Sequence, residues 1–257
     1  MNQNLIDYTL HLADTTLILA QRNSEWCGHG PILEQDIAIT NISLDLIGQS
    51  RNFYQYAATL MNLPITIGTT NNPANLSTED SLAYLRTERE FKNLLLVEQP
   101  NVDWGQTILR QFYFSVYQLY LFQQLQNSND EQLAAIATKA LKEITYHVRW
   151  SSEWVIRLGD GTTESHQRML AAIEELKNYI GEFFIAAGYE TPMGIDFALL
   201  KQQWEEKTKA VFEEATLPYP EKTFNQSGGK TGTHTEHLGY ILAEMQYLQR
   251  TYPGAEW

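Results

Sequence analysis

Cysteine is almost missing from this chain of 257 residues, with Cys27 the only one. A single cysteine excludes an intrachain disulfide and favours a reducing compartment. The N-terminal residues also lack the charged region and apolar core of a secretion signal. The longest apolar run near them, Leu17–Ala20, is far too short to span a bilayer. We therefore expect a cytoplasmic protein that is not built into a membrane.

Positive charge is scarce as well. The chain has 18 Lys and Arg residues against 31 Asp and Glu, a net charge of −13, and no run of three basic residues. Because phosphate groups would repel such a chain, neither a nucleic acid nor an anionic membrane surface is an expected partner. With 43% apolar and 19% charged residues, the composition is that of a globular protein that buries a substantial core.

Proline is rare too, at eight residues, and alternating runs of β-branched residues are few. Helical periodicity dominates instead. Pro31 suits the first turn of a helix, and Gly159 and Gly161 predict a glycine C-cap. The segment 62–79 is a loop by composition. The expected helices are Leu5–Gln21, Pro31–Met61, Ser81–Val97, Trp104–Gln126, Glu131–Leu158, Glu164–Phe184, Asp196–Glu214 and His234–Arg250. They predict an all-α fold, a ferritin-like four-helix bundle with additional peripheral helices, as one domain over 1–257.

The usual iron ligands of such a bundle are absent from the sequence. In ferritin-like carboxylate proteins two helices each give a Glu, and two more each give a Glu-x-x-His pair. Neither Glu-x-x-His nor Asp-x-x-His occurs here, and the segment Gln106–Asn127 has no acidic residue. Three residues after Asp45 stands Gly48, which cannot bind iron. We therefore expect no catalytic residue and no metal ligand in this chain, and a role in holding a partner.

A remnant of a metal site is the most that the pattern offers. Glu143 and His147 lie four residues apart, so they share one helix face. That face is otherwise apolar, with Leu133, Ile136, Ala140, Trp150 and Trp154. The pair is either a metal-ligand pair at a non-standard spacing or a buried polar pair that fixes helix register. Since a di-iron site also needs carboxylates on other helices, we favour the second. Together with Asp45, the pair is our candidate degenerate metal site.

Two short segments combine histidine with other reactive or polar side chains. A Cys–His pair one residue apart is weak evidence for a nucleophile, and a lone His-x-x-His is weak evidence for zinc. We interpret both segments as candidate docking surfaces for a partner protein. Their residues are Trp26 and His29 beside Cys27, and His234, Glu236 and His237 at the start of the last helix.

Aromatic residues crowd into one expected helix, Trp104–Gln126. Six of them fall around much of its circumference, so they cannot all face one core: Phe112, Tyr113, Phe114, Tyr117, Tyr120 and Phe122. Either this helix is buried on nearly all sides, or one of its faces packs on another chain. The second interpretation favours an obligate assembly, self-association included.

Several separated blocks resemble the C subunits of bacterial phenylacetyl-CoA epoxidases, multicomponent oxygenases of aerobic phenylacetate breakdown. The resemblance covers essentially the whole chain in order, which makes it far more specific than a single motif. Its blocks are Ser24–His29, Asn41–Gln49, Asn93–Asn101, Ala140–His147, Arg157–Gly161, and His234–Gly239 continuing into Ala243–Arg250.

The resemblance implies a ferritin-like subunit that has lost its di-iron site. It implies a homologous catalytic A subunit as partner, which carries the iron and binds the CoA thioester. A small B subunit and a reductase with FAD, iron–sulfur centres and NADPH would complete the system. The family assigns no catalytic residue to this subunit, so no cofactor is expected in this chain.

Two alternatives stay open. One is an independent metalloenzyme with an atypical site made of Glu25, Asp45, Glu143 and His147, which predicts bound iron or manganese. The other is a stand-alone helical binding protein with no link to an oxygenase, which predicts a stable monomer.

Overall fold

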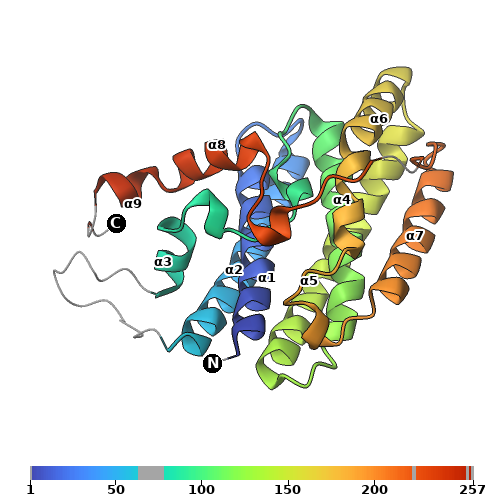
Figure 1. Cartoon of the computed structure of the whole chain (residues 1–257). Coiled ribbons are helices and arrows are strands. Elements are labelled where there is room, and N and C mark those ends of the chain that lie inside the picture. Colours follow the sequence, from blue (N-terminus) through green and yellow to red (C-terminus); the bar gives the residue numbers. More distant parts are fainter. Residues whose placement is uncertain (1, 63–77, 222–223, 253–254, 256–257) are drawn as a thin grey trace. The chain divides into compact units, whose positions relative to one another are not determined.

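The computed structural model describes residues 2–62, 78–221, 224–252 and 255, and these residues form helices and no strand. The all-α fold and the four long helices of the ferritin-like prediction are confirmed (Figure 1). The chain forms two compact units, which we describe separately. The first comprises Met1–Leu94, Ala187–Pro192 and Gly228–Trp257, and the second Leu95–Ala186 and Met193–Ser227. The single domain expected over 1–257 stays a prediction.

The first unit is built on a hairpin of two long helices. Every residue of α1 from Leu5 to Ala20 is buried except Asp7, so α1 is covered on nearly all sides. The helix begins at an N-cap, Asn2, whose side chain accepts the amide N–H of Leu5. The helices of this unit are α1 (Gln3–Ser24), α2 (Leu33–Leu60), α3 (Thr78–Tyr84), η1 (Glu88–Glu90), η6 (Gly229–Thr231), α8 (Glu236–Met245) and α9 (Tyr247–Thr251).

The second unit contains the other two long helices, and shorter helices pack against them. Four side chains cap helix N-termini by accepting amide N–H groups of the first turn, as Asp, Ser and Thr side chains commonly do. These caps are Asp103, Asp130, Thr162 and Asp196. The helices are η2 (Leu95–Glu98), α4 (Trp104–Leu125), α5 (Glu131–Gly159), α6 (Thr163–Leu176), η3 (Lys177–Tyr179), η4 (Gly181–Phe184) and α7 (Phe197–Glu214). Helix η5 (Thr191–Met193) lies where the chain returns to this unit.

The aromatic helix α4 is buried within this chain. All residues from Trp104 to Gln118 are buried, and only Leu119 and Tyr120 in its aromatic part are half-buried. Of the two interpretations of its aromatic crowding, burial on nearly all sides is therefore the correct one. The rings of α4 need no second chain to cover them.

Some predicted helix boundaries are wrong. Pro31 precedes α2, because Ile32 is the N-cap of that helix. The expected helix Ser81–Val97 is only α3 followed by two short 3-10 helices, and the expected helix Glu164–Phe184 is α-helical only to Leu176. The expected final helix is interrupted at Gln246, between α8 and α9. Most of the loop predicted at 62–79 lies outside the described residues. No helix in the described part of the chain is long and apolar enough to cross a membrane.

Candidate functional site

The residues of the predicted degenerate metal site do not lie in one unit. Asp45 is half-buried on α2 in the first unit, whereas Glu143 and His147 lie on α5 in the second. His147 is fully buried and Glu143 is half-buried, so the α5 stripe faces inward over most of its length. Among the described residues, no group of three or more His, Cys, Asp or Glu side chains is arranged to hold a metal ion.

The first unit instead contains a buried ion pair that the sequence interpretation missed. Asp14 of α1 is fully buried, and both of its carboxylate oxygens accept hydrogen bonds from the guanidinium of Arg86. The hydroxyl of Tyr54 donates to Oδ1 at 2.6 Å, and the amide N–H of Lys92 donates to Oδ2 at 2.8 Å. We call these four residues the Asp14 cluster.

The electrostatics of the Asp14 cluster are those of a closed structural pair. Burial lowers the pKa of Arg86, but Asp14 and Tyr54 together outweigh this effect and raise that pKa above its ordinary value. Burial and the negative charge of Asp14 raise the pKa of Tyr54 well above 10.0. Arg86 and Tyr54 therefore keep their protons at neutral pH. Since Arg86 and its neighbours occupy both oxygens of Asp14, this carboxylate is not arranged to bind a metal.

A second buried polar group, the Glu190 cluster, lies in the same unit and consists of His11, Glu190 and Lys230. The ammonium of Lys230 lies 2.9 Å from Oε2 and 3.2 Å from Oε1 of Glu190. Nε2 of His11 lies 3.8 Å from Glu190 Oε1, and Nδ1–H of the same ring donates to the carbonyl of Lys92 at 2.6 Å. Burial lowers the pKa of His11 below 6.5, so the ring is neutral at neutral pH. The lysine therefore neutralises the carboxylate.

The second unit has a buried cation in its acid-free helix. Arg110 of α4 is fully buried and donates to the carbonyl oxygen of Gln99 and to Oδ1 of Asn101 at 2.5 Å. A fixed positive charge repels a metal cation, and α4 offers no carboxylate against it. The donor set of the described residues therefore does not fit the di-iron centre that the fold class often carries.

The two predicted docking segments both lie in the first unit. His29 is exposed and Trp26 half-buried, while Asp36 of α2 accepts the amide N–H of Gly30 at 3.0 Å and holds this turn. The amide N–H groups of Gly30 and Gly28 also lower the pKa of the Asp36 carboxyl. Cys27 is a free, exposed cysteine. Docking at this turn stays a prediction.

The other docking segment opens α8. The ring Nε2–H of His234 donates to the carbonyl of Phe91 at 2.9 Å, so this histidine anchors the chain before the helix begins. Glu236 is exposed and His237 half-buried. Docking at these two residues and at His234 stays a prediction, and the contact of His234 gives it a structural role in addition.

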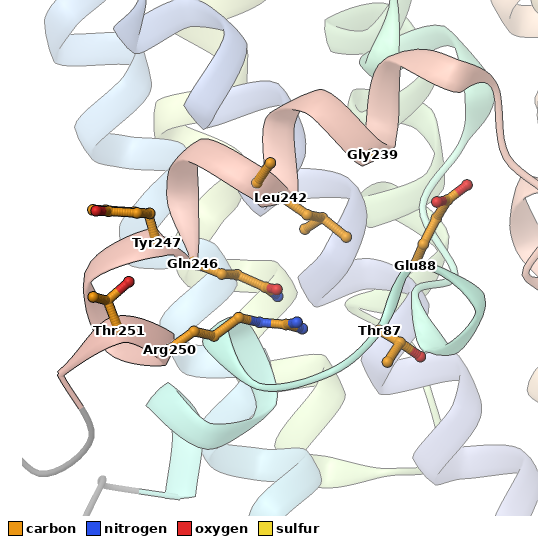
Figure 2. A pocket seen from close by; sticks show the side chains of 9 residues that line it. Thr87, Glu88, Gly239, Leu242, Gln246, Tyr247, Arg250 and Thr251 are labelled. Carbon is orange, nitrogen blue, oxygen red and sulfur yellow. The ribbon is translucent and has the colours of Figure 1, made fainter.

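A groove of about 340 Å³ lies beside α8 and α9, against the segment that follows α3. Figure 2 shows Gln246 and Arg250 extending from these helices toward the segment with Thr87 and Glu88. Gln246 and Arg250 donate to the carbonyl of Arg86 at 3.0 and 3.2 Å, respectively. The polar groups on this side of the groove therefore tie the C-terminal helices to the rest of the unit.

Comparison with known proteins gives the family. A family model described as "Phenylacetic acid catabolic protein" matches residues 1–257. The chain belongs to this family. A similar relative is the C subunit of the 1,2-phenylacetyl-CoA epoxidase of Escherichia coli strain K12, which is 48% identical over 262 residues, with 100% of each chain covered. The family resemblance found in the sequence is thus confirmed.

Several polar contacts of this chain fall in the blocks that carry the family resemblance. Gln99 and Asn101, which hold Arg110, end the block Asn93–Asn101. His234, which anchors α8, begins another block. Their hydrogen bonds give these residue types a structural role.

Proposed function

We propose that this chain is the C subunit of a phenylacetyl-CoA epoxidase and acts as its non-catalytic structural subunit in aerobic phenylacetate breakdown. The observation that carries the proposal is the full-length match, at 48% identity, to a protein named as that subunit. An alignment that covers both chains from end to end favours the same place in the same kind of assembly.

The buried polar groups support a structural role. Where a catalytic relative would need free carboxylates, Asp14 is held by Arg86, Glu190 is held by Lys230, and α4 carries the buried cation Arg110. The two closed pairs orient helices and occupy the carboxylate oxygens of Asp14 and Glu190. The di-iron centre, in this proposal, belongs to the catalytic A subunit.

An apolar stripe on α2 supports a partner. Leu33, Ile37, Leu44 and Ile47 follow one another at spacings of four, seven and three residues, so they share one helix face. Their exposed fractions are 71, 52, 60 and 42%. Large apolar side chains in a row on one helix are typical of a surface that another helix covers. We infer that this α2 stripe meets the catalytic subunit, with a small B subunit and a flavin, iron–sulfur and NADPH-dependent reductase completing the system.

Co-expression tests the partner role. The catalytic subunit would be produced alone, with this chain, and with the double variant Leu44→Glu and Ile47→Glu. Its soluble yield, its iron content and its turnover of phenylacetyl-CoA would be measured. We expect all three to fall without the chain and with the double variant. Leu199→Glu on α7, where the side chain is 42% exposed, is the matched control and should behave as wild type. A soluble, fully active catalytic subunit on its own would refute the proposal.

Metal analysis tests the non-catalytic part. The chain would be purified alone from iron-supplemented cells, together with Glu143→Ala. We expect no stoichiometric iron or manganese in either. Near-stoichiometric metal that disappears in Glu143→Ala would instead establish the independent metalloenzyme. A cytoplasmic location stays a prediction from the sequence.

A further inference from the structure

The second unit contains a pocket that the proposed structural role does not use. Its volume is about 610 Å³, within the range of small-molecule sites. Three parts of the chain form its wall: the 3-10 helices after α6, the first half of α7, and the residues 219–221 and 225. The lining combines four aromatic side chains, Phe184, Phe197, Trp204 and Tyr219, with small and aliphatic residues and four charged ones.

The aromatic wall is fixed before any ligand arrives. The rings of Phe184 and Trp204 meet edge to face with centroids 5.6 Å apart. The indole N–H of Trp204 donates to the carbonyl of Tyr113 at 3.0 Å, which sets the orientation of that ring. Tyr219 lies edge-on to Phe212, at 6.1 Å. A preformed wall of rings loses little conformational entropy when a flat apolar group binds.

The charged side chains of the wall differ in whether they form ion pairs. Lys177 lies 2.5 Å from Glu174, and Glu205 lies 3.8 Å from Lys209, so each of these two lining residues has an ion-pair partner that does not line the pocket. Lys201 is half-buried and has no acidic side chain within 4.0 Å in the described part of the chain. The remaining carboxylate of the wall, Glu221, is exposed. Lys201 is therefore the lining cation that forms no ion pair with another described residue.

We propose that this pocket binds a small carboxylate that bears an aromatic ring. The ring would pack against Phe184 and Trp204, and the carboxylate would bind the ammonium of Lys201. Charge complementarity and ring-on-ring packing carry the proposal. It does not rest on the epoxidase role, because the site needs neither a partner nor a metal.

Titration of the full-length chain tests this site, with phenylacetate as the probe. Binding would be followed by calorimetry and by saturation transfer to the ring protons. We expect phenylacetate to bind at one site, saturably, with a dissociation constant below about 10 mM. The dissociation constant should be about tenfold higher for 2-phenylethanol, which has no charge, and for acetate, which lacks the ring. Lys201→Gln should weaken phenylacetate binding by a similar factor while leaving 2-phenylethanol unchanged.

Lys207→Gln provides the matched control, because Lys207 lies on the same helix but does not line the pocket. It should bind phenylacetate as wild type does. Equal losses in Lys201→Gln and Lys207→Gln would reduce the effect to net charge and overturn the proposal. Absence of saturable binding, or wild-type affinity in Lys201→Gln, would overturn it as well. Co-expression of the epoxidase subunits would be unaffected by any of these outcomes.

Discussion

The ion pair between Asp14 and Arg86 dominates the polar core of the first unit at the scale of single residues. The side chain of Asp14 is fully buried and that of Arg86 is 11% exposed, so neither charge is well solvated. A buried pair adds little compared with an apolar pair, but removal of one partner leaves the other charge uncompensated. The cost of a single substitution is therefore large.

We expect Asp14→Asn to lower the free energy of unfolding by about 3–5 kcal/mol, because Arg86 would stay buried without a counter-charge. The asparagine has one acceptor oxygen where the aspartate has two, so it can accept from the amide of Lys92 while its NH2 group donates to the hydroxyl of Tyr54. Denaturant unfolding followed by circular dichroism measures the effect. Arg51→Gln is the control, since Arg51 is 68% exposed in its pair with Glu79 and should cost less than about 1 kcal/mol. Equal losses in the two variants would contradict a special role for the buried pair.

His11 makes stability depend on pH. Burial lowers its pKa from 6.5, and Lys230 lowers it further, against the opposing effects of Glu190, the Lys92 carbonyl and Asp14. Between 6.5 and the lower folded pKa, the unfolded chain binds a proton that the folded chain does not. Neutral His11 therefore makes its full contribution to the free energy of unfolding above pH 6.5. This contribution is lost as the pH falls from 6.5 through the folded pKa.

The matching variant is His11→Asn, whose side-chain amide can still donate to the carbonyl of Lys92. We expect the wild type to lose stability more steeply than this variant as the pH is lowered from about 7 to 5. Denaturant unfolding at several pH values gives both slopes. Parallel slopes would show that His11 does not titrate on unfolding.

These residue-scale features could not be predicted from spacing. Asp14 and Arg86 lie 72 residues apart, and Glu190 and Lys230 lie 40 apart. No local periodicity joins such positions, and only the fold brings them together. Asp14 did leave one signal that the sequence interpretation passed over. It is a charged residue inside the otherwise uncharged stretch Leu10–Ala20 of a long helix, and a buried charge needs a partner.

At the scale of elements, the four long helices were predicted to within a few residues because their apolar periodicity is strong. The expected helix Ser81–Val97 was wrong for a tertiary reason. After α3 the backbone leaves the helix, and Arg86 donates to the carbonyls of Leu82 and Glu90 and to Asp14. Thr87 and Glu90 then form a capping box around η1. The buried ion pair outweighed helix propensity.

Gly159 was predicted as a helix C-cap, and the helix does end there, but the physical reason is different. Its φ is not in the left-handed region, and Asp160 is the C-cap residue. A Cβ at Gly159 would lie 2.4 Å from the carbonyl oxygen of Ala215 and 2.9 Å from its Cβ. The glycine is therefore required by the close approach of α5 to the segment after α7.

Gly159→Ala should consequently lower the free energy of unfolding by about 1–3 kcal/mol through this overlap. Gly48 is the natural comparison. It lies inside α2, and a Cβ there would meet nothing within 4 Å, so Gly48→Ala should raise stability by about 0.5–1 kcal/mol through helix propensity. Thermal or denaturant unfolding of the two variants gives both signs. A gain in both would mean that the backbone near Ala215 yields without cost.

For the whole molecule, the first unit takes in three stretches of the chain. The short stretch Ala187–Pro192 returns to it from the second unit, and Gly228–Trp257 completes it. Glu190 and Lys230 belong to these two stretches, and their side chains are 1% and 4% exposed. The amide N–H of Ala187 also donates to Glu190, and the hydroxyl of Tyr189 donates to the carbonyl of Lys230. We infer that this pair fixes the returning stretch in place.

Lys230→Met should therefore destabilise the first unit strongly, by about 3–5 kcal/mol, because Glu190 stays buried without its counter-charge. Adding Glu190→Gln should recover part of the loss, since the glutamine is neutral and can still accept from Ala187.

Amide hydrogen exchange locates the effect. The Glu190 amide, which donates to the Ala187 carbonyl at 2.9 Å, should exchange faster in Lys230→Met and more slowly again in the double variant. Lys209→Met, which breaks a pair whose lysine is 57% exposed, should leave that amide unchanged. Additive losses in the double variant would mean that the two charges stabilise the unit independently, and that packing alone holds the returning stretch.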